Sequence, residues 1–351
     1  MQAVQLEGFL RDAESARTAL AEPIAPESGQ IVAFLRQPEN ANHLEEFRRL
    51  SRVSDAEAAW SIARQWIVIA ASAWIALRAH HVLVYALAIV VIATRQHALG
   101  VLMHEGTHYR LFSSRRANDV LGDLLCAFPI NMTVSRYRHD HLLHHKFNMT
   151  ERDPYWQEWK ADSHWHWPKA RKEGLLLFAG DLLMLNMRRI GKTVSKWSPW
   201  SNHWSKAAYP TPLTPSERLR LYAFWVCVLT IVTLAKGWVP FLLLWALPLS
   251  TLVVLFARVR SVAEHLSLAE TTEFERSRHV RGTLLERWTI APLNVNIHLA
   301  HHLFPAVPQY NLPRLHRLLL AYPPYARGGA QYDSYLSGGR RVFRDMWTRG
   351  G

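Results

Sequence analysis

The apolar residues of this chain gather into two pairs of long runs, with a long polar stretch between the pairs. The first pair is WSIARQWIVIAASAWIAL, which starts at Trp60, and VLVYALAIVVIAT, which ends before Arg95. The second pair covers residues 221–235 and 239–257, separated by the turn KGW. At about 1.5 Å per residue, each run approaches the roughly 30 Å of a bilayer core. The pattern predicts an all-α integral membrane protein with four transmembrane helices in two hairpins.

The positive charge of the chain is distributed unevenly around these runs. Two hairpins place the N-terminus, the stretch from Arg95 to Arg220 and the tail after Arg258 on one side of the membrane. Nearly all Lys and Arg lie in these parts, whereas the two turns offer Arg78 and Lys236. By the positive-inside rule the large side is cytoplasmic, so we expect a multi-pass protein with a cytosolic helical cap. Lipid headgroups then explain the net charge of +13, and no nucleic-acid partner is expected because few aromatics interleave with the basic runs.

Composition divides the chain into three expected segments. Residues 1–58 are polar and form a cytoplasmic N-terminal segment, residues 59–320 form the membrane domain, and residues 321–351 form a basic cytoplasmic tail. The start of the chain carries acids and lacks a basic region followed by an apolar core, so no cleavable signal peptide is expected. The two cysteines, Cys126 and Cys227, lie in apolar surroundings, which argues against a disulfide framework or a cysteine zinc site.

Two tryptophan-rich segments of the cytoplasmic part indicate contact with the membrane surface. Residues 155–169 and 197–206 crowd Trp beside polar side chains, which is typical of the membrane–water boundary. Between them, residues 174–189 have an apolar bias over about four turns that is broken by Asp181. This segment predicts a helix that lies in the interface and does not cross the membrane.

Eleven of the nineteen histidines stand in short groups on the side predicted to be cytoplasmic. At about 100° per residue, the three in HALGVLMHEGTH share one helix face. RHDHLLHH and NIHLAHH each contain the pattern H-x-x-H-H, which places three imidazoles within one helical turn. Two such turns and a third paired site make chance an unsatisfactory explanation. The groups are His97, His104 and His108; His139, His141, His144 and His145; His298, His301 and His302; and His265 alone in AEH.

The pattern H-E-x-x-H at His104, Glu105 and His108 is also that of a zinc peptidase, in which the glutamate is the general base. A catalytic zinc needs three protein ligands and one open position. Eight or nine clustered imidazoles exceed that need and match two metal ions, each with four or five histidines. Imidazole ligation suits iron, copper or zinc, so donor type alone does not name the metal. A pair of oxygen-activating irons would explain a redox site beside membrane spans, with an acyl chain entering from the bilayer.

The motifs HEGTH, HLLHH and HLAHH, in this order and interleaved with four spans, resemble the three histidine boxes of the membrane fatty-acid desaturase superfamily. The resemblance covers about residues 66–320 and includes Asp153-Pro154 and HHLFPAVPQYNLPRLHRL beside the boxes. It implies a four-span fold, a non-haem di-iron centre of two Fe and O2 as co-substrate. The implied metal ligands, which are also the catalytic residues, are His104, His108, His141, His144, His145, His298, His301 and His302, with His265 in the place where some members supply an additional ligand.

Five further residues are candidates for supporting the ligands. Asn294 precedes the third box by four residues, a position suited to a water-mediated role. Glu105, Glu264 and Asp153 can each accept the other N–H of an imidazole, as can Asp140. His97 and His139 stay outside the ligand set because one lies deeper in the span and the other points away from its neighbours on a helix. Surface or interface positions are expected for His80, His81, His164, His166, His203, His279 and His316.

The resemblance implies oxidation of an unactivated C–H bond in an acyl or lipid-like substrate, with fatty-acid desaturation as the first expectation. Hydroxylation and loss of a carboxylate to give a terminal alkene remain open on the same scaffold. No fused electron carrier is visible, so a separate reductase and a ferredoxin, rubredoxin or cytochrome b5 type carrier are expected. An intramembrane zinc metallopeptidase and a non-enzymatic metal-binding or transport protein are the alternatives from other classes.

Overall fold

The computed structural model of the chain describes residues 26–189, 191, 196–200, 212–266, 268, 272–328 and 330–348. Within these residues the protein is mostly helical, and its one sheet has two short parallel strands. Part of the predicted N-terminal segment, part of the second tryptophan-rich segment and the end of the predicted tail lie outside the described residues. The division into three segments stays a prediction.

Three helices among the described residues are long and apolar enough to cross a membrane. They are α4 (Asp55–Ala79), α5 (Val82–Thr107) and the composite helix Trp238–His265. The composite helix consists of α12 (Trp238–Phe241), a π turn (Leu242–Ala246), α13 (Leu247–Ser250) and α14 (Leu252–His265).

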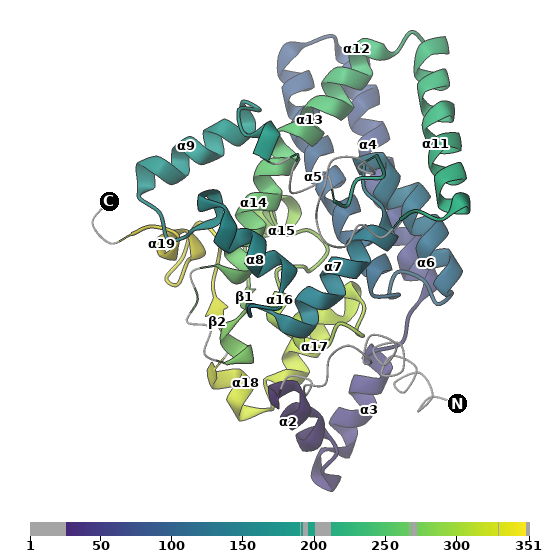
Figure 1. The fold of residues 1–351 in the computed structure, drawn as a ribbon. Coiled ribbons are helices and arrows are strands. Elements are labelled where there is room, and N and C mark those ends of the chain that lie inside the picture. The colour runs from purple at the N-terminus through teal and green to yellow at the C-terminus, as the bar shows by residue number, and fades with distance from the viewer. Residues whose placement is uncertain are drawn as a thin grey trace.

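The remaining predicted span forms a helix but does not meet the same standard. This helix, α11 (Pro215–Leu234), begins with a capping box between Thr214 and Glu217. Its first turns therefore contain Glu217, Arg218 and Arg220, and its uninterrupted apolar stretch is too short. Figure 1 shows α11 leading into α12 at the upper end of the molecule, and the two helices are in contact. The structure supports three spans, and the fourth stays a prediction.

The helix α5 extends well past the predicted end of its span at Arg95. Its 26 residues give a length of about 39 Å, whereas a bilayer core is roughly 30 Å thick. Arg95 is buried, and its guanidinium donates to Gln65 Oε1 (3.0 Å) on α4 and to the carbonyl of Trp288 (2.5 Å). These hydrogen bonds satisfy a cation that apolar surroundings would otherwise make costly. The last turns of α5 thus reach into the cap.

The part of the molecule that we call the cap consists of short helices that follow α5 and α14 along the chain, together with α2 (Pro26–Leu35) and α3 (Ala41–Leu50). After α5 come α6 (Arg115–Gly122), α7 (Val134–Phe147), α8 (Pro154–Ala161) and α9 (Arg171–Leu182). After α14 come α15 (Leu284–Thr289), α16 (His298–Leu303), α17 (Leu312–Leu319), α18 (Pro323–Gly328) and α19 (Val342–Asp345). The helices α2 and α3 lie at the far end from α12 (Figure 1), where α3 packs on α17.

The two strands fix the return of the chain between α14 and α16. Strand β1 (Arg278–Val280) pairs in parallel with β2 (Ala330–Tyr332). The Arg278 guanidinium is buried and donates to the carbonyls at the end of α14, including that of Leu266 at 2.6 Å. These bonds occupy carbonyls that the end of a helix leaves without intrahelical partners. They hold the C-terminal end of α14 against the cap.

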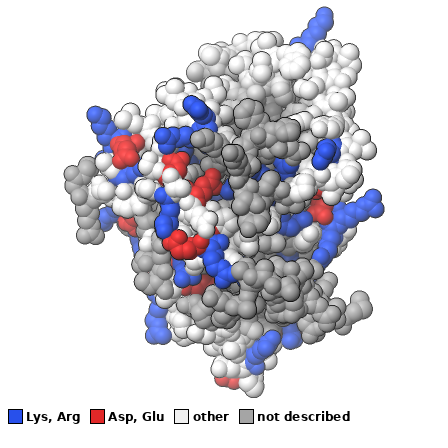
Figure 2. All heavy atoms as spheres, viewed as in Figure 1, with Lys and Arg blue, Asp and Glu red and all other residues white. Residues whose placement is uncertain are grey.

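The surface separates apolar from charged regions in the way that the sequence predicts. In Figure 2 the upper part of the molecule, around α11 and α12, is almost free of charge, whereas charged residues of both signs gather over the cap. The first part of the predicted interface segment lies in α9, where Leu175 and Leu176 are exposed, and Leu185 is exposed just after the helix ends at Leu182. Asp181, which interrupts its apolar pattern, is buried and paired with Arg258 of α14. Placement of α9 in a membrane interface stays a prediction.

Candidate metal centre

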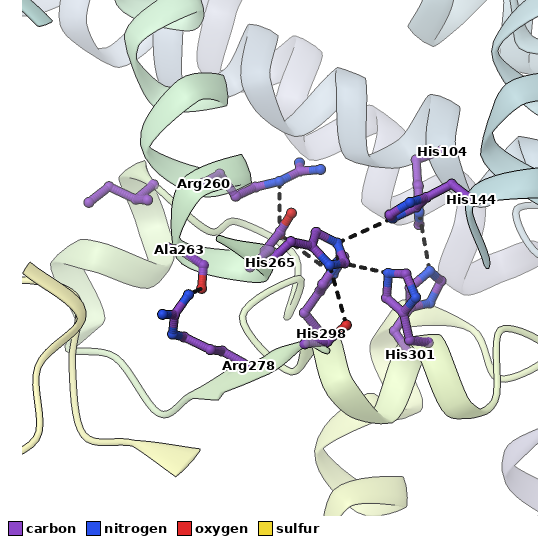
Figure 3. Close-up of polar contacts among 12 residues, drawn as sticks. His104, His144, Arg260, Ala263, His265, Arg278, His298 and His301 are labelled. Atoms are coloured by element: carbon purple, nitrogen blue, oxygen red, sulfur yellow. Dashed lines mark hydrogen bonds and ion pairs between the residues drawn. The ribbon is translucent and has the colours of Figure 1, made fainter. Parts of the chain in front are cut away.

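Four helices bring histidine side chains to one buried place in the cap. His104 lies in the last turn of α5, and His108 caps that helix. Helix α7 supplies three histidines, α14 ends at His265, and α16 supplies another three. The H-x-x-H-H spacing places each set of three on about one turn of helix, so both sets can face the end of α5. Figure 3 shows His104 meeting His301, and His265 lying between His144 and His298.

Five imidazoles form the first group, in which the potential ligand atoms all lie within 4.8 Å of one another. The Nε2 atom of His141 is 3.0 Å from that of His108 and 3.0 Å from that of His145. His104 and His301 approach each other through Nε2 at 3.1 Å. The members are His104, His108, His141, His145 and His301.

The other four predicted ligands lie beside the first group in two overlapping sets that share His265, and we call them together the second group: His144, His265 and His302, and His265 and His298 with Glu264. His265 is its centre, with Nε2 at 3.2 Å from that of His144 and 2.8 Å from that of His298. The Nε2 atoms of His298 and His302 are 3.0 Å apart. The rings of His302 and His145 stack at a centroid distance of 4.1 Å, so the two groups are in contact.

The arrangement of nitrogen atoms fits metal ions better than hydrogen bonds. A neutral imidazole carries one N–H, so a web in which Nε2 atoms face one another cannot supply a proton to every contact. Two nitrogens at about 2.1 Å from one ion and at a right angle would be about 3.0 Å apart, which is the spacing seen here. The cluster is therefore able to bind metal, and its division into five and four matches two ions.

The protonation of the cluster also suits metal binding. Burial, followed by the neighbouring imidazoles, holds the pKa values of His141, His145 and His302 well below their usual range. Burial and then Arg260 lower the pKa of His301 to about 3. These side chains are consequently neutral at pH 7, and a neutral imidazole offers the lone pair that a metal needs.

Three of the predicted acids lie next to ligand imidazoles. Asp153 is fully buried and its Oδ2 is 2.8 Å from His144 Nδ1. Glu264 Oε1 is 3.5 Å from His298 Nδ1. Glu105 Oε1 is 3.6 Å from His104 Nδ1. Carboxylates at this position fix the tautomer and the orientation of a metal-binding histidine.

The other two supporting candidates have partners outside the cluster. The side chain of Asn294 donates to the carbonyl of Gln309 at 3.1 Å, and the Gln309 N–H donates to Glu105 Oε2 at 2.8 Å. Asn294 is thereby connected to the first histidine group through the segment after the third box. Asp140 accepts a hydrogen bond from Trp197 Nε1 at 3.1 Å and lies 3.5 Å from Lys196 Nζ. It therefore binds residues of the segment 196–197 and not an imidazole of the cluster.

The histidines left out of the ligand set have other surroundings. His97 is buried on α5 and its Nε2 is 3.0 Å from the carbonyl of Ile290. His279 and His316 stack on each other at 3.8 Å. His166 is exposed, and His164 lines the cavity described below. His203 lies outside the described residues.

A cavity of about 580 Å³ reaches the second histidine group and part of the first. One wall is apolar and comes from α13 and α14, including Leu249, Val253 and Val254. The histidines that line the cavity are His104, His141, His144, His265 and His298, with His97 deeper along α5 and His164 near Asp162 and Arg189. Its volume and mixed lining are typical of a site for a small or drug-sized organic molecule.

Sequence reasoning missed three side chains that shape this cavity. Tyr155 stacks on His144 at 4.5 Å, and Tyr137 stacks on His141 at 5.0 Å. Tyr137 lies four residues before His141, so helical spacing could have found it. Arg260 lies four residues before Glu264 and pairs with it, and the same spacing rule applies. Nothing in the sequence signals the Tyr155 contact, because α8 packs on α7 through tertiary structure.

Comparison with known proteins gives one consistent result. The model of the fatty acid desaturase family matches residues 80–334, which contain all three histidine motifs. Dihydrorhizobitoxine desaturase of Bradyrhizobium elkanii is 26% identical over 261 residues, which is 71% of each chain. Chloroplastic omega-6 fatty acid desaturases of Glycine max and Brassica napus are each 24% identical over 62% of this chain. The chain spans about half the length of these two plant relatives.

The family match covers most of the chain and confirms the resemblance of the histidine motifs. Together with three apolar helices it supports a membrane-associated oxidoreductase that acts on lipid-like molecules. The chain belongs to the fatty acid desaturase family.

Proposed function

We propose that the protein is a di-iron, O2-dependent oxidoreductase that desaturates an acyl or lipid-like substrate within its cavity. The observation that carries the proposal is the meeting of nine imidazoles, through Nε2, in adjacent groups of five and four. Imidazole donors suit iron among other metals, and the family match favours iron. All nine histidines are assigned as metal ligands. Supporting positions beside them are assigned to Glu105, Glu264, Asp153 and Asn294.

The proposed reaction removes two hydrogens from adjacent carbons. A –CH2–CH2– unit, O2, two electrons and two protons give –CH=CH– and two molecules of water. When bound, iron supplies oxygen activation, which no amino-acid side chain can provide. The protein supplies position and exclusion of water, through burial of the nine imidazoles and an apolar wall on α14. The acids beside Nδ1 keep Nε2 free of protons for the metal.

The proposal extends to topology and electron supply. Four spans, with α11 as the fourth, would place the cluster and the basic cap on the cytoplasmic side, as the positive-inside rule expects. Electrons would come from a separate reductase and a small carrier of the ferredoxin, rubredoxin or cytochrome b5 type. A positively charged cap is suited to docking an acidic carrier.

Desaturation is preferred because the relatives described above are named desaturases. Hydroxylation, or loss of the carboxylate to give a terminal alkene, uses the same cluster and remains the alternative. The zinc peptidase is disfavoured because Glu105 is not among the residues that line the described cavity, and its Oε2 accepts the Gln309 N–H.

The test is metal content and product formation of purified full-length protein, with His301→Ala as the variant. We expect about two irons per chain in the wild type, reductant-dependent and O2-dependent oxidation of acyl substrates, and loss of that oxidation in His301→Ala. The matched control is His166→Ala, which removes an exposed histidine of the cap. One zinc and no iron in active protein would refute the proposal.

A further inference from the structure

An arginine lies unusually close to the histidine cluster. Arg260 is on α14, one turn before Glu264, and its Nε is 2.9 Å from Glu264 Oε1. The same carboxylate oxygen is 3.5 Å from His298 Nδ1. The guanidinium is thus separated from a predicted metal ligand by a single oxygen atom. Figure 3 shows the side chain of Arg260 extending from α14 toward the histidines.

The guanidinium of Arg260 has capacity to bind a further group. It carries five N–H donors, and Glu264 lies against its Nε edge. Among the described residues, the terminal nitrogens of Arg260 have no protein acceptor, and Arg260 lines the cavity. The other arginines of the cavity wall already have partners: Arg258 pairs with Asp181 and Arg189 with Asp162.

The charge of the site favours an anion beside Arg260. The nine predicted ligands are histidines, which are neutral when they bind metal, and Glu264 is the one acid grouped with them among the described residues, so most of the charge of two cations stays uncompensated. Glu264 offsets part of this charge but also faces Arg260. An anionic group between Arg260 and the cluster would be attracted from both sides. The two terminal nitrogens of a guanidinium match the two oxygens of a carboxylate.

The apolar wall of the cavity indicates where the hydrocarbon tail of such an anion would lie. From Glu264, the lining residues of the composite helix run back through Ala257 and Val254 to Leu249, over roughly 22 Å of chain. Gly100, Met103 and Ile130 complete the apolar lining. A hydrocarbon tail along this wall leads away from the histidines. Only carbons next to the anionic end would stay beside the cluster.

We propose that Arg260 binds the free carboxylate of a fatty acid and holds the carbons next to that carboxylate at the histidine cluster. This inference rests on the proposed function for its chemistry, but not for the binding step. It names an unesterified acid as the substrate class and places oxidation near the carboxyl end. The opposite arrangement would put the head group at the polar end near Asp162 and Arg189 and oxidise the middle of the chain.

The first experiment measures binding without turnover. Dodecanoate and methyl dodecanoate are titrated into full-length protein in detergent, and quenching of tryptophan fluorescence reports binding because Trp159, Trp165 and Trp197 line the cavity. A charge-assisted bidentate contact predicts at least about tenfold tighter binding of the acid than of the ester. Arg260→Gln should remove this preference, and Arg260→Lys should keep part of it.

Two controls separate carboxylate binding from a structural role. Arg281→Gln removes an arginine that is 80% exposed and far from the cavity lining, and should keep the wild-type preference. Arg260→Gln alone leaves the buried Glu264 carboxylate without its partner, and this unpaired charge could itself weaken binding of the acid. The double variant Arg260→Gln/Glu264→Gln removes both charges, so it separates this effect from loss of the carboxylate contact. It should lose the preference as fully as Arg260→Gln. Recovery of the preference in the double variant would overturn the inference.

The second experiment maps the oxidised carbon. Products from dodecanoate should carry the change at C2 or C3, or lack the carboxyl carbon. A mid-chain alkene, or equal binding of acid and ester by the wild type, would overturn the inference while leaving the proposed oxidation intact. An acid preference that depends on Arg260, in a protein that oxidises nothing, would support the binding site and refute the proposed function.

Discussion

Asp153→Asn is the most informative single change, because one buried carboxylate controls both a helix start and a histidine tautomer. Asp153 Oδ1 accepts the Tyr155 N–H at 2.8 Å and so caps α8. Its Oδ2 accepts the Met149 N–H at 3.0 Å and contacts His144 Nδ1 at 2.8 Å. As a carboxylate it can only accept, so His144 must carry its proton on Nδ1 and present the Nε2 lone pair to the cluster.

Asparagine at position 153 would keep the N-cap of α8 but would replace the acceptor that faces His144 with a donor. Asn and Asp are comparable N-caps, so Oδ1 can continue to accept from Tyr155. The amide nitrogen would then face His144 Nδ1, so two donors would oppose each other. This conflict is removed only if the proton of His144 moves to Nε2, and that move takes away the lone pair that a metal would bind. Loss of such an outer partner costs about 10- to 100-fold in metal affinity, or about 1.4–2.7 kcal/mol. The Met149 N–H, left without an acceptor, adds about 1–3 kcal/mol of instability.

The assay is competition for iron against a chelator of known affinity, with metal per chain measured in parallel. The matched control is Asp162→Asn, since Asp162 caps the turn Ser163–Trp165 through the His164 N–H at 3.0 Å and touches no predicted ligand. We expect the control to keep wild-type metal affinity. Wild-type affinity in Asp153→Asn would refute the assignment of His144 as a ligand through Nε2.

Two further predictions follow from other contacts. Glu105→Gln should reduce oxidation less than Asp153→Asn does, because Glu105 Oε1 is 3.6 Å from His104 Nδ1, beyond hydrogen-bond distance, and a glutamine oxygen can still accept the Gln309 N–H. Complete loss of activity with metal retained, measured by product formation, would contradict this. Burial and the stacked His316 lower the pKa of His279 to about 3. Below about pH 6.5 this histidine is therefore protonated in the unfolded chain but stays neutral in the folded chain, which favours unfolding. The contribution of His279 to stability should therefore be constant above pH 6.5 and fall by up to about 1.4 kcal/mol per pH unit below it, and His279→Asn should reduce the slope of stability against pH by this amount in unfolding curves from pH 7.5 to 5.

The histidine spacing allowed most of the candidate site to be predicted. The nine predicted ligands all lie in the two groups, because H-x-x-H-H on a helix presents its imidazoles within one turn whatever the surroundings. Asp153, Glu105 and Glu264 lie beside imidazoles because they flank the motifs along the chain. Their binding of metal stays a prediction. Tyr155 escaped prediction because its contact with His144 depends on how α8 packs on α7, whereas Arg260 stands four residues before Glu264 and the spacing rule could have found it.

The spans were predicted in part for a similar reason. Long apolar runs identify α4, α5 and the composite helix, since length and composition alone decide whether a helix can cross a membrane. The predicted end of the second span at Arg95 does not end the helix, because Gln65 and the carbonyl of Trp288 satisfy the guanidinium. In α11, the capping box at Thr214 draws charged residues into the first turns, which the apolar count did not consider.

By itself the sequence determined the types of helix and the supply of imidazoles, because both depend on spacing along one chain. Only the tertiary structure decided how those imidazoles divide, with His145 in the group of five and its neighbour His144 beside His265 and His302. Adjacent residues on a helix point about 100° apart, so they join different groups once other helices approach from both sides. The tertiary structure likewise placed Arg260 beside His298 through Glu264. That contact joins α14 to α16, and no pattern within either helix contains it.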